Sequence, residues 1–142
     1  MTTIAADAKR GCMACDSMTS TSDAWWPSTK VWRVDGALIG GAGEVASIRQ
    51  FITWYTDGQR LPKPKISDSF CALVLCKEGL FYWASNLNPE PIERGFHAIG
   101  SGGGPALGAL LAGANVKRAV EIACEVDTAS GGEVILHKLR DR

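Results

Sequence analysis

Along the first two thirds of the chain, short apolar runs alternate with polar turns, which is the pattern of β-hairpins. Three such turns are Lys9-Arg10-Gly11, Asp35-Gly36 and Glu78-Gly79. Asp-Gly is a strong signal for a two-residue turn because both residues tolerate a positive φ. The expected strands that flank these turns are residues 2–8 and 12–16, 30–34 and 37–41, and 69–77 and 80–86. The pattern therefore predicts three hairpins and mostly antiparallel sheets.

The spacing of apolar residues changes between the second and third hairpins. Apolar side chains from Ile48 to Tyr55 recur at i, i+3, i+4 and i+7, which places them on one face of a helix. This helix is expected to begin at about Glu44 and to end near Asp57-Gly58. Residues 60–67 carry two prolines and three basic residues and favour an extended, solvated loop.

The last third of the chain predicts two further helices and a final strand. Pro105 follows a glycine-rich stretch and suits the first turn of a helix. Asn115 is a good N-cap for a second helix that ends at about Val126. Residues 133–139 are expected to form a strand. This order of elements indicates an α+β sandwich, and the length favours a single domain over residues 1–142.

Charge and hydropathy limit the partners that the chain can bind. Its 15 Lys and Arg residues balance 15 Asp and Glu residues, so no basic surplus attracts nucleic acid or an anionic membrane. The longest weakly polar run, residues 106–114, is shorter than the roughly 20 residues of a membrane span, and no apolar secretory segment is recognised at the N-terminus. We therefore predict a cytoplasmic protein that binds neither nucleic acid nor membranes.

The cysteines do not form a disulfide framework. Their number is odd, five, and only Cys12 and Cys15 form a C-x-x-C motif. These two residues belong to an expected strand, where positions three apart face opposite sides of the sheet. Only His97 and His137 could complete a metal site. We therefore interpret the cysteines as small apolar side chains of the core, and we predict no metal or other cofactor.

A glycine motif between the second hairpin and the first helix invites a nucleotide-binding interpretation. Gly41-Ala42-Gly43-Glu44-Val45-Ala46 fits G-x-G-x-x-A. A dinucleotide site also requires a parallel strand after the helix that ends in an acidic residue, and here the helix runs into residues 58–64 instead. Neither glycine cluster is followed by Lys-Ser or Lys-Thr. Nucleotide binding is therefore a disfavoured hypothesis.

The second residue carries the candidate chemistry. After removal of Met1, the hydroxyl of Thr2 can attack a carbonyl carbon while its own α-amine serves as the base. An unperturbed α-amine titrates near pH ~7.7 to 8, so a useful fraction is neutral in the cytosol. Such a site also needs a cation beside the nucleophile, a carboxylate that holds this cation, and backbone donors for the oxyanion.

Six sequence features resemble, in order, those of the proteasome β-subunits and the bacterial peptidase HslV, which are N-terminal-nucleophile (Ntn) hydrolases. The resemblance covers nearly the whole chain. The features are Thr2-Thr3-Ile4, Ala14-Cys15-Asp16-Ser17, Lys30-Val31-Trp32-Arg33, Ala42-Gly43-Glu44-Val45-Ala46, Ile99-Gly100-Ser101-Gly102-Gly103 and Val126-Asp127-Thr128-Ala129-Ser130-Gly131-Gly132.

The resemblance implies a role for each matching position. Thr2 is the nucleophile, Asp16 the catalytic carboxylate and Lys30 its cationic partner. The N–H of Gly43 is the candidate oxyanion donor, with Gly40 as an alternative register. Around these, the residues expected to orient the N-terminal amine are Ser101, Asp127 and Ser130, and the expected wall of the substrate pocket is Val45.

The same resemblance implies a four-layer αββα Ntn-hydrolase sandwich in which one helix after the second hairpin is shortened or missing. The implied function is a threonine-type endopeptidase that degrades unfolded polypeptides inside a homo-oligomeric ring, with a ring ATPase of the HslU type as candidate partner. A catalytically inactive scaffold or assembly protein on this fold is the alternative. Trp54 and the Trp25-Trp26 pair are candidates for subunit contacts or for the core.

Overall fold

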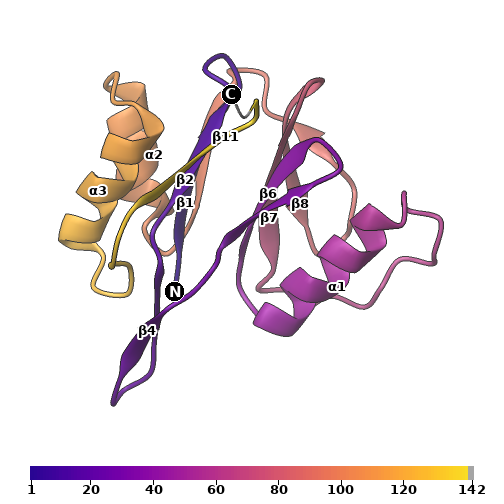
Figure 1. Ribbon diagram of the computed structural model, residues 1–142, viewed down its shortest axis with the longest axis horizontal. Coiled ribbons are helices and arrows are strands. Elements are labelled where there is room, and N and C mark those ends of the chain that lie inside the picture. The colour runs from indigo at the N-terminus through magenta and orange to yellow at the C-terminus, as the bar shows by residue number, and fades with distance from the viewer. Residues whose placement is uncertain (141–142) are drawn as a thin grey trace.

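Two antiparallel sheets packed face to face form the centre of the structure, a computed structural model that describes residues 1–140 (Figure 1). The strand order of the four-stranded sheet is β10-β1-β2-β11, with β1 (Thr3–Asp7), β2 (Cys12–Cys15), β10 (Phe96–Gly100) and β11 (Ile135–Lys138). The order of the five-stranded sheet is β5-β6-β7-β8-β9, with β5 (Val31–Val34), β6 (Ala37–Ala42), β7 (Cys71–Cys76), β8 (Gly79–Ala84) and β9 (Glu90–Pro91). The pairs β1-β2, β5-β6 and β7-β8 confirm the three predicted hairpins.

Helices cover the outer faces of both sheets (Figure 1). α1 (Val45–Thr56) packs on the five-stranded sheet, whereas α2 (Gly103–Leu111) and α3 (Val116–Val126) pack on the four-stranded sheet. Asn115 caps α3 as predicted, because its Oδ1 accepts a hydrogen bond from the N–H of Arg118 at 2.8 Å. The layers are therefore helix, sheet, sheet and helix, which confirms the expected αββα sandwich. No helix within residues 1–140 is long and apolar enough to cross a membrane.

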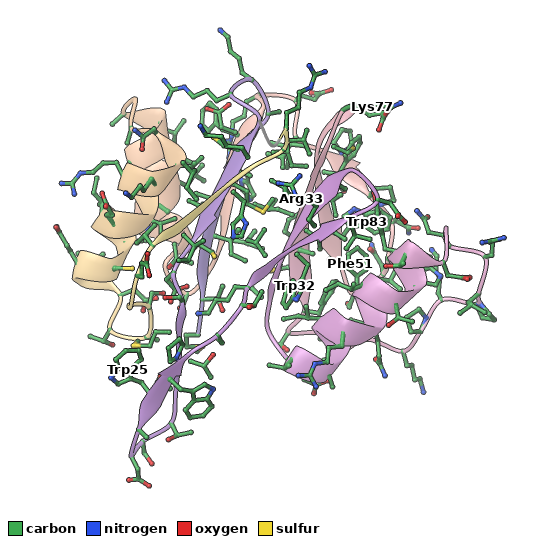
Figure 2. All side chains as sticks on the ribbon, in the orientation of Figure 1. Trp25, Trp32, Arg33, Phe51, Lys77 and Trp83 are labelled. Atoms are coloured by element: carbon green, nitrogen blue, oxygen red, sulfur yellow. The ribbon has the colours of Figure 1, made fainter. Side chains whose placement is uncertain are left out.

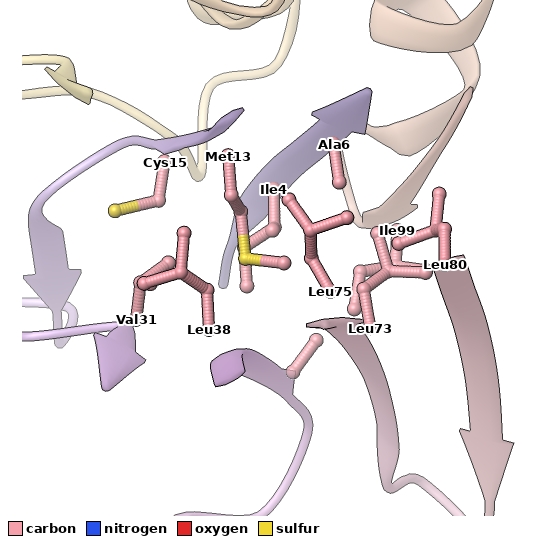
Figure 3. Close-up of a cluster of buried hydrophobic side chains, with 11 residues drawn as sticks. Ile4, Ala6, Met13, Cys15, Val31, Leu38, Leu73, Leu75, Leu80 and Ile99 are labelled. Carbon is pink, nitrogen blue, oxygen red and sulfur yellow. The ribbon is translucent and has the colours of Figure 1, made fainter. Parts of the chain in front are cut away.

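The core between the two sheets is built from inward-facing side chains of both. Ile4 and Met13 of the four-stranded sheet point toward Leu38 and Leu73 of the five-stranded sheet (Figure 3). Gly40 belongs to the same face of β6. A Cβ at that position would lie 2.8 Å from the Ile4 side chain and 2.9 Å from Met13 Sδ, closer than real contacts allow. The missing side chain at position 40 therefore lets the sheets approach one another beside the start of β1.

A single helix, α1, covers the five-stranded sheet within residues 1–140. The following residues 57–70 are irregular, in agreement with the predicted loop and with the shortened helical layer. Trp54 Nε1 donates a hydrogen bond to the Leu61 carbonyl at 2.9 Å and holds this segment against α1. Because Trp54 is buried, it belongs to the core rather than to an exposed contact surface.

Two regions differ from the sequence predictions. Between residues 16 and 30, where no strand is predicted, β3 (Met18–Ser20) and β4 (Trp25–Pro27) pair as a separate hairpin that projects from the body (Figure 1). Trp25 and Trp26 are 58% and 47% exposed, so no buried face imposes an alternating pattern on this hairpin.

Strand β10 is also absent from the predictions. It pairs with β1 at the edge of the four-stranded sheet, yet its two buried apolar residues, Ala98 and Ile99, are adjacent rather than alternating. The neighbouring glycine-rich stretch obscures the strand further. Long-range pairing with β1, rather than a local pattern, defines this element.

The helix α1 is fixed to its sheet by an aromatic cluster. Phe51 is fully buried, and its ring centroid lies 5.2 Å from the rings of both Phe70 and Trp83. Tilted aromatic pairs at this spacing contribute beyond the area that they bury. Phe51 therefore connects α1, the segment before β7 and strand β8.

We predict that Phe51→Ala lowers the free energy of unfolding by about 3–5 kcal/mol, because it leaves a cavity among rigid rings. Urea denaturation monitored by tryptophan fluorescence measures this loss. Gln50→Ala, on the exposed side of the same helix, is the control and should change the free energy by less than about 0.5 kcal/mol. Similar losses in both variants would contradict the assigned packing.

Candidate active site

Several segments that are distant in sequence meet at one end of the sandwich, around the start of β1, where the N-terminus lies (Figure 1). The residue after β2, the residue before β5 and the loops after β10 and α3 all reach this end. Hydrogen bonds connect these predicted site residues through side chains and backbone: Thr2, Asp16, Lys30, Ser101, Asp127 and Ser130. The structure thus brings together six positions that span almost the whole chain.

The innermost part of the site is a buried ion pair between Asp16 and Lys30. Lys30 Nζ lies 2.9 Å and 3.0 Å from the two carboxylate oxygens, and the side chains are 6% and 0% exposed for Lys30 and Asp16. Nζ also donates hydrogen bonds to the carbonyl oxygens of Met18 at 2.6 Å and Met1 at 2.7 Å. All three donors of the ammonium group are therefore satisfied.

Asp16 is equally well supplied with partners. Its oxygens accept hydrogen bonds from the N–H groups of Thr3 at 2.9 Å and Gly131 at 3.0 Å, in addition to the contacts with Lys30. Burying two charges is costly unless their remaining hydrogen-bonding capacity is filled. Because these partners come from β1 and from the loop before β11, the ion pair fixes these segments relative to the start of β5.

A second carboxylate, Asp127, holds two hydroxyl groups near the N-terminus. Its Oδ2 accepts a hydrogen bond of 2.6 Å from Ser101 Oγ and another of 2.6 Å from Ser130 Oγ. A serine hydroxyl has a single proton. Ser101 Oγ, which gives its proton to Asp127, is therefore an acceptor for the backbone N–H of Thr2 at 3.3 Å.

The surroundings of Asp127 favour its charged form. Burial acts to raise the pKa of this carboxyl, but the hydrogen bonds from Ser101, Ser130 and the N–H of Ala129, together with the charge of the N-terminus, outweigh it. The net result is a pKa below the ordinary value of 3.8. Asp127 is therefore an anion at neutral pH.

Thr3 belongs to this network, although sequence reasoning did not single it out. Its side chain is fully buried, and its Oγ1 lies 2.7 Å from Ser130 Oγ. Since Ser130 donates to Asp127, Thr3 is the donor to Ser130. The sequence signal that could have pointed to Thr3 was its hydroxyl group directly after Thr2. Successive residues of a strand face opposite sides of the sheet, so Thr3 was expected to face away from Thr2.

A cavity of about 770 Å³ opens beside Thr2. The predicted site residues on its wall are Thr2, Lys30, Gly43 and Val45. The large apolar side chains that line it are Met1, Trp26, Trp32, Ile48 and Ile52. Because β4, β5 and α1 all contribute to this wall, the cavity presents an apolar surface next to the polar network.

The turn from β6 into α1 places Gly43 on the cavity wall. Its φ is +102°, and a Cβ there would lie 2.3 Å from the Ser69 carbonyl oxygen, so only glycine fits. Gly40, the alternative position, lies inside β6 with hydrogen-bonded strands on both sides. Gly43 lines the cavity and Gly40 is not among its lining residues, so Gly43 stays the candidate oxyanion donor.

The glycine motif serves packing rather than a dinucleotide fold. A Cβ at Gly41 would lie 2.7 Å from the Ile48 side chain, so this glycine lets α1 approach β6. The strand that follows α1 is β7, and it pairs antiparallel to β6. A dinucleotide-binding unit requires a parallel strand there.

The cysteines and histidines do not form a catalytic or metal-binding group of their own. Cys12 packs under α2 and α3, whereas Cys15 faces the other sheet, as expected for residues three apart in a strand. Burial, followed by the charge of Asp16, raises the pKa of the Cys15 thiol to about 12, so it is not a thiolate nucleophile. His97 and His137 lie on opposite edge strands of the four-stranded sheet. Within residues 1–140, no group of three or more metal-ligating side chains could hold a metal ion.

Comparison with known proteins gives matches at the level of structure alone. No protein-family model matches the chain, and no curated protein matches its sequence. Eukaryotic HslV from Trypanosoma brucei has a TM-score of 0.75 and 21% identity, over 96% of this chain and 98% of that chain.

Thiobacillus denitrificans BPH is similar over its full length. Its complex with epoxomicin has a TM-score of 0.70 and 20% identity over 98% of this chain, and a second BPH structure has a TM-score of 0.69 and 20% identity over 99% of this chain. Each match covers 100% of the BPH chain. At these identities the likeness establishes architecture: the chain has the HslV and proteasome-type fold.

Proposed function

We propose that this chain is a threonine-type endopeptidase whose nucleophile is Thr2 after removal of Met1. The observation that carries the proposal is the convergence of two carboxylate-centred networks on Thr2. Asp16 and Lys30 bind the backbone of the two neighbours of Thr2, namely Thr3 and Met1. Ser101, which Asp127 orients, accepts a hydrogen bond from the Thr2 nitrogen itself. The shared fold with HslV supports this reaction class.

Removal of Met1 changes the environment of Lys30. Its ammonium group now donates to the Met1 carbonyl oxygen at 2.7 Å. Loss of that acceptor frees one N–H beside Thr2. The positive charge, kept in place by Asp16, then lowers the pKa of the Thr2 hydroxyl and favours its deprotonation.

The new α-amine of Thr2 acts as the base. Ser101 Oγ lies 3.3 Å from this nitrogen and is itself oriented by Asp127. The proton of the Thr2 hydroxyl passes to the amine while Thr2 Oγ1 attacks the peptide carbonyl carbon. The N–H of Gly43 stabilises the resulting oxyanion. The amine then protonates the leaving nitrogen, and water hydrolyses the resulting ester. Val45 and the apolar wall hold the side chain before the scissile bond.

The proposal extends to assembly and substrate. A homo-oligomeric ring that encloses the cavity would restrict access to unfolded polypeptides, and a ring ATPase of the HslU type would supply them. Trp25 and Trp26, exposed on the β3–β4 hairpin, are the candidate subunit contacts in such a ring. Cytoplasmic location stays a prediction from the sequence.

An inactive scaffold on the same fold is the second candidate. The proposed reaction needs the free α-amine of Thr2, and with Met1 attached this nitrogen is an amide that cannot act as the base. Processing of Met1 therefore separates the two candidates.

We expect the purified protein to lack Met1 and to gain one adduct on Thr2 when treated with a peptide epoxyketone, a reagent that requires both the hydroxyl and the amine of an N-terminal threonine. Intact-mass spectrometry and peptide mapping measure both changes. Thr2→Ala should give no adduct. A retained Met1 with no adduct would favour the scaffold.

Lys30→Met should reduce peptidase activity by at least about 100-fold, because the charge beside the nucleophile is lost. It should also destabilise the fold by about 3–5 kcal/mol, because Asp16 is left buried without its partner. The double variant Asp16→Asn/Lys30→Met should recover part of the stability but no activity. If the double variant regained activity together with stability, Lys30 would have only a structural role. Lys117→Met, on the exposed side of α3, is the control for the loss of a lysine charge elsewhere.

The lowered pKa of Asp127 predicts a pH-dependent contribution to stability. This contribution is fully present above the unfolded-state pKa and is lost as the pH falls through the lower folded-state pKa. The stability difference between the wild type and Asp127→Asn should therefore stay constant above about pH 5 and shrink below about pH 4. Urea denaturation across this range measures it. A difference that did not change with pH would contradict the assigned hydrogen bonds to the carboxylate, and Asp23→Asn, an exposed site, is the control.

A further inference from the structure

A second cavity, of about 420 Å³, lies at the opposite end of the sandwich from Thr2. It forms where three segments meet: the β1–β2 turn, the β7–β8 turn and the end of β11. The β1–β2 turn is at the far end of β1 from the N-terminus (Figure 1). Nothing in the proposed peptidase reaction uses this region.

The lining of this cavity is strongly basic. Its charged residues are Lys9, Arg10, Lys77, Lys138 and Arg140, and no Asp or Glu lines it within residues 1–140. These are five of the 15 basic residues of a chain whose net charge is zero. The positive potential is therefore a local feature of this end rather than a property of the whole surface.

Neighbouring carboxylates neutralise little of this charge. Arg10 lies 3.9 Å from Asp7 and Lys77 lies 3.9 Å from Glu78, and the basic partners are 56% and 87% exposed, so both pairs are weak. Within residues 1–140, no carboxylate oxygen lies within 4.0 Å of the ammonium groups of Lys9 or Lys138. At least two lysines of the cavity are thus available to an anion.

The backbone that carries these side chains is held in place. The N–H of Leu139 donates to the Gly11 carbonyl at 2.8 Å, which joins the end of β11 to the β1–β2 turn. Arg33 donates to the carbonyl oxygens of Lys138 and Leu139 from the other sheet. Figure 2 shows Arg33 on β5 and Lys77 at the turn between β7 and β8. Cations on an anchored backbone need less ordering when a ligand binds.

We propose that this basic cavity binds the polyphosphate group of a small anion. Several lysines and arginines around one hollow suit an anion with several charged oxygens, since arginine binds phosphate oxygens in pairs and lysine binds them as a point charge. No aromatic side chain lines the cavity within residues 1–140, so a nucleobase has nothing to stack on. Phosphate groups alone, from an inorganic chain or from a nucleotide, are therefore the recognised chemistry.

Isothermal titration calorimetry with inorganic tripolyphosphate tests the proposal on the intact chain. The double variant Lys9→Glu/Lys138→Glu should bind at least about tenfold more weakly than the wild type, because two charge-assisted contacts are reversed. The control variant, Lys63→Glu/Lys117→Glu, makes the same charge change away from the cavity and should bind like the wild type. Equal urea midpoints of the variants exclude unfolding as the cause.

Three results would overturn the proposal: no binding by the wild type, equal weakening in both double variants, or equally tight binding of citrate, which carries carboxylates instead of phosphates. ATP identifies the source of the phosphates. Equal affinities for ATP and tripolyphosphate support recognition of phosphate alone. A preference for ATP of more than about tenfold would replace this assignment with a nucleotide site, because the base would then contribute about 1.4 kcal/mol.

Discussion

The buried pair of Asp16 and Lys30 is the interaction on which the rest of the site depends. It joins the end of β2 to the start of β5, and so connects the two sheets at the end where the chain begins. Hydrogen bonds from Thr3 and Gly131 extend the connection to β1 and to the segment before β11. A charge pair in this position is stable only with all its partners, so the geometry of four segments is set together.

The two carboxylates of the site, Asp16 and Asp127, have different environments and are therefore suited to different tasks. Asp16 is fully buried and directly paired with a cation, which suits it to holding a positive charge near the start of β1. Asp127 is partly exposed and surrounded by hydroxyl groups, which suits it to orienting the nitrogen of Thr2 through Ser101. Thr3 connects the two networks, since its N–H donates to Asp16 and its hydroxyl to Ser130. The first residue of β1 thus connects to both carboxylates, to Asp16 directly and to Asp127 through Ser130.

Much of the fold could be predicted because its signals are local. The turn at Asp35-Gly36, the helical spacing after Ile48 and the cap at Asn115 each depend on a few neighbouring residues. The β7–β8 hairpin was predicted in the same way, although its turn lies at Lys77-Glu78, one residue before the predicted Glu78-Gly79. The β3–β4 hairpin and strand β10 could not be predicted from such signals. The hairpin buries too little to impose a pattern, and β10 is defined by its partner β1.

The sequence by itself determined the residue types of the site and, through their resemblance in order and spacing, the architecture that carries them. Only the tertiary structure decided which atoms meet. The direction of the hydrogen bonds around Asp127, the part played by Thr3 and the position of Gly43, rather than Gly40, on the cavity wall depend on contacts between distant segments. The basic cavity at the other end has the same origin, because its charges come from three turns and strand ends that no local pattern relates.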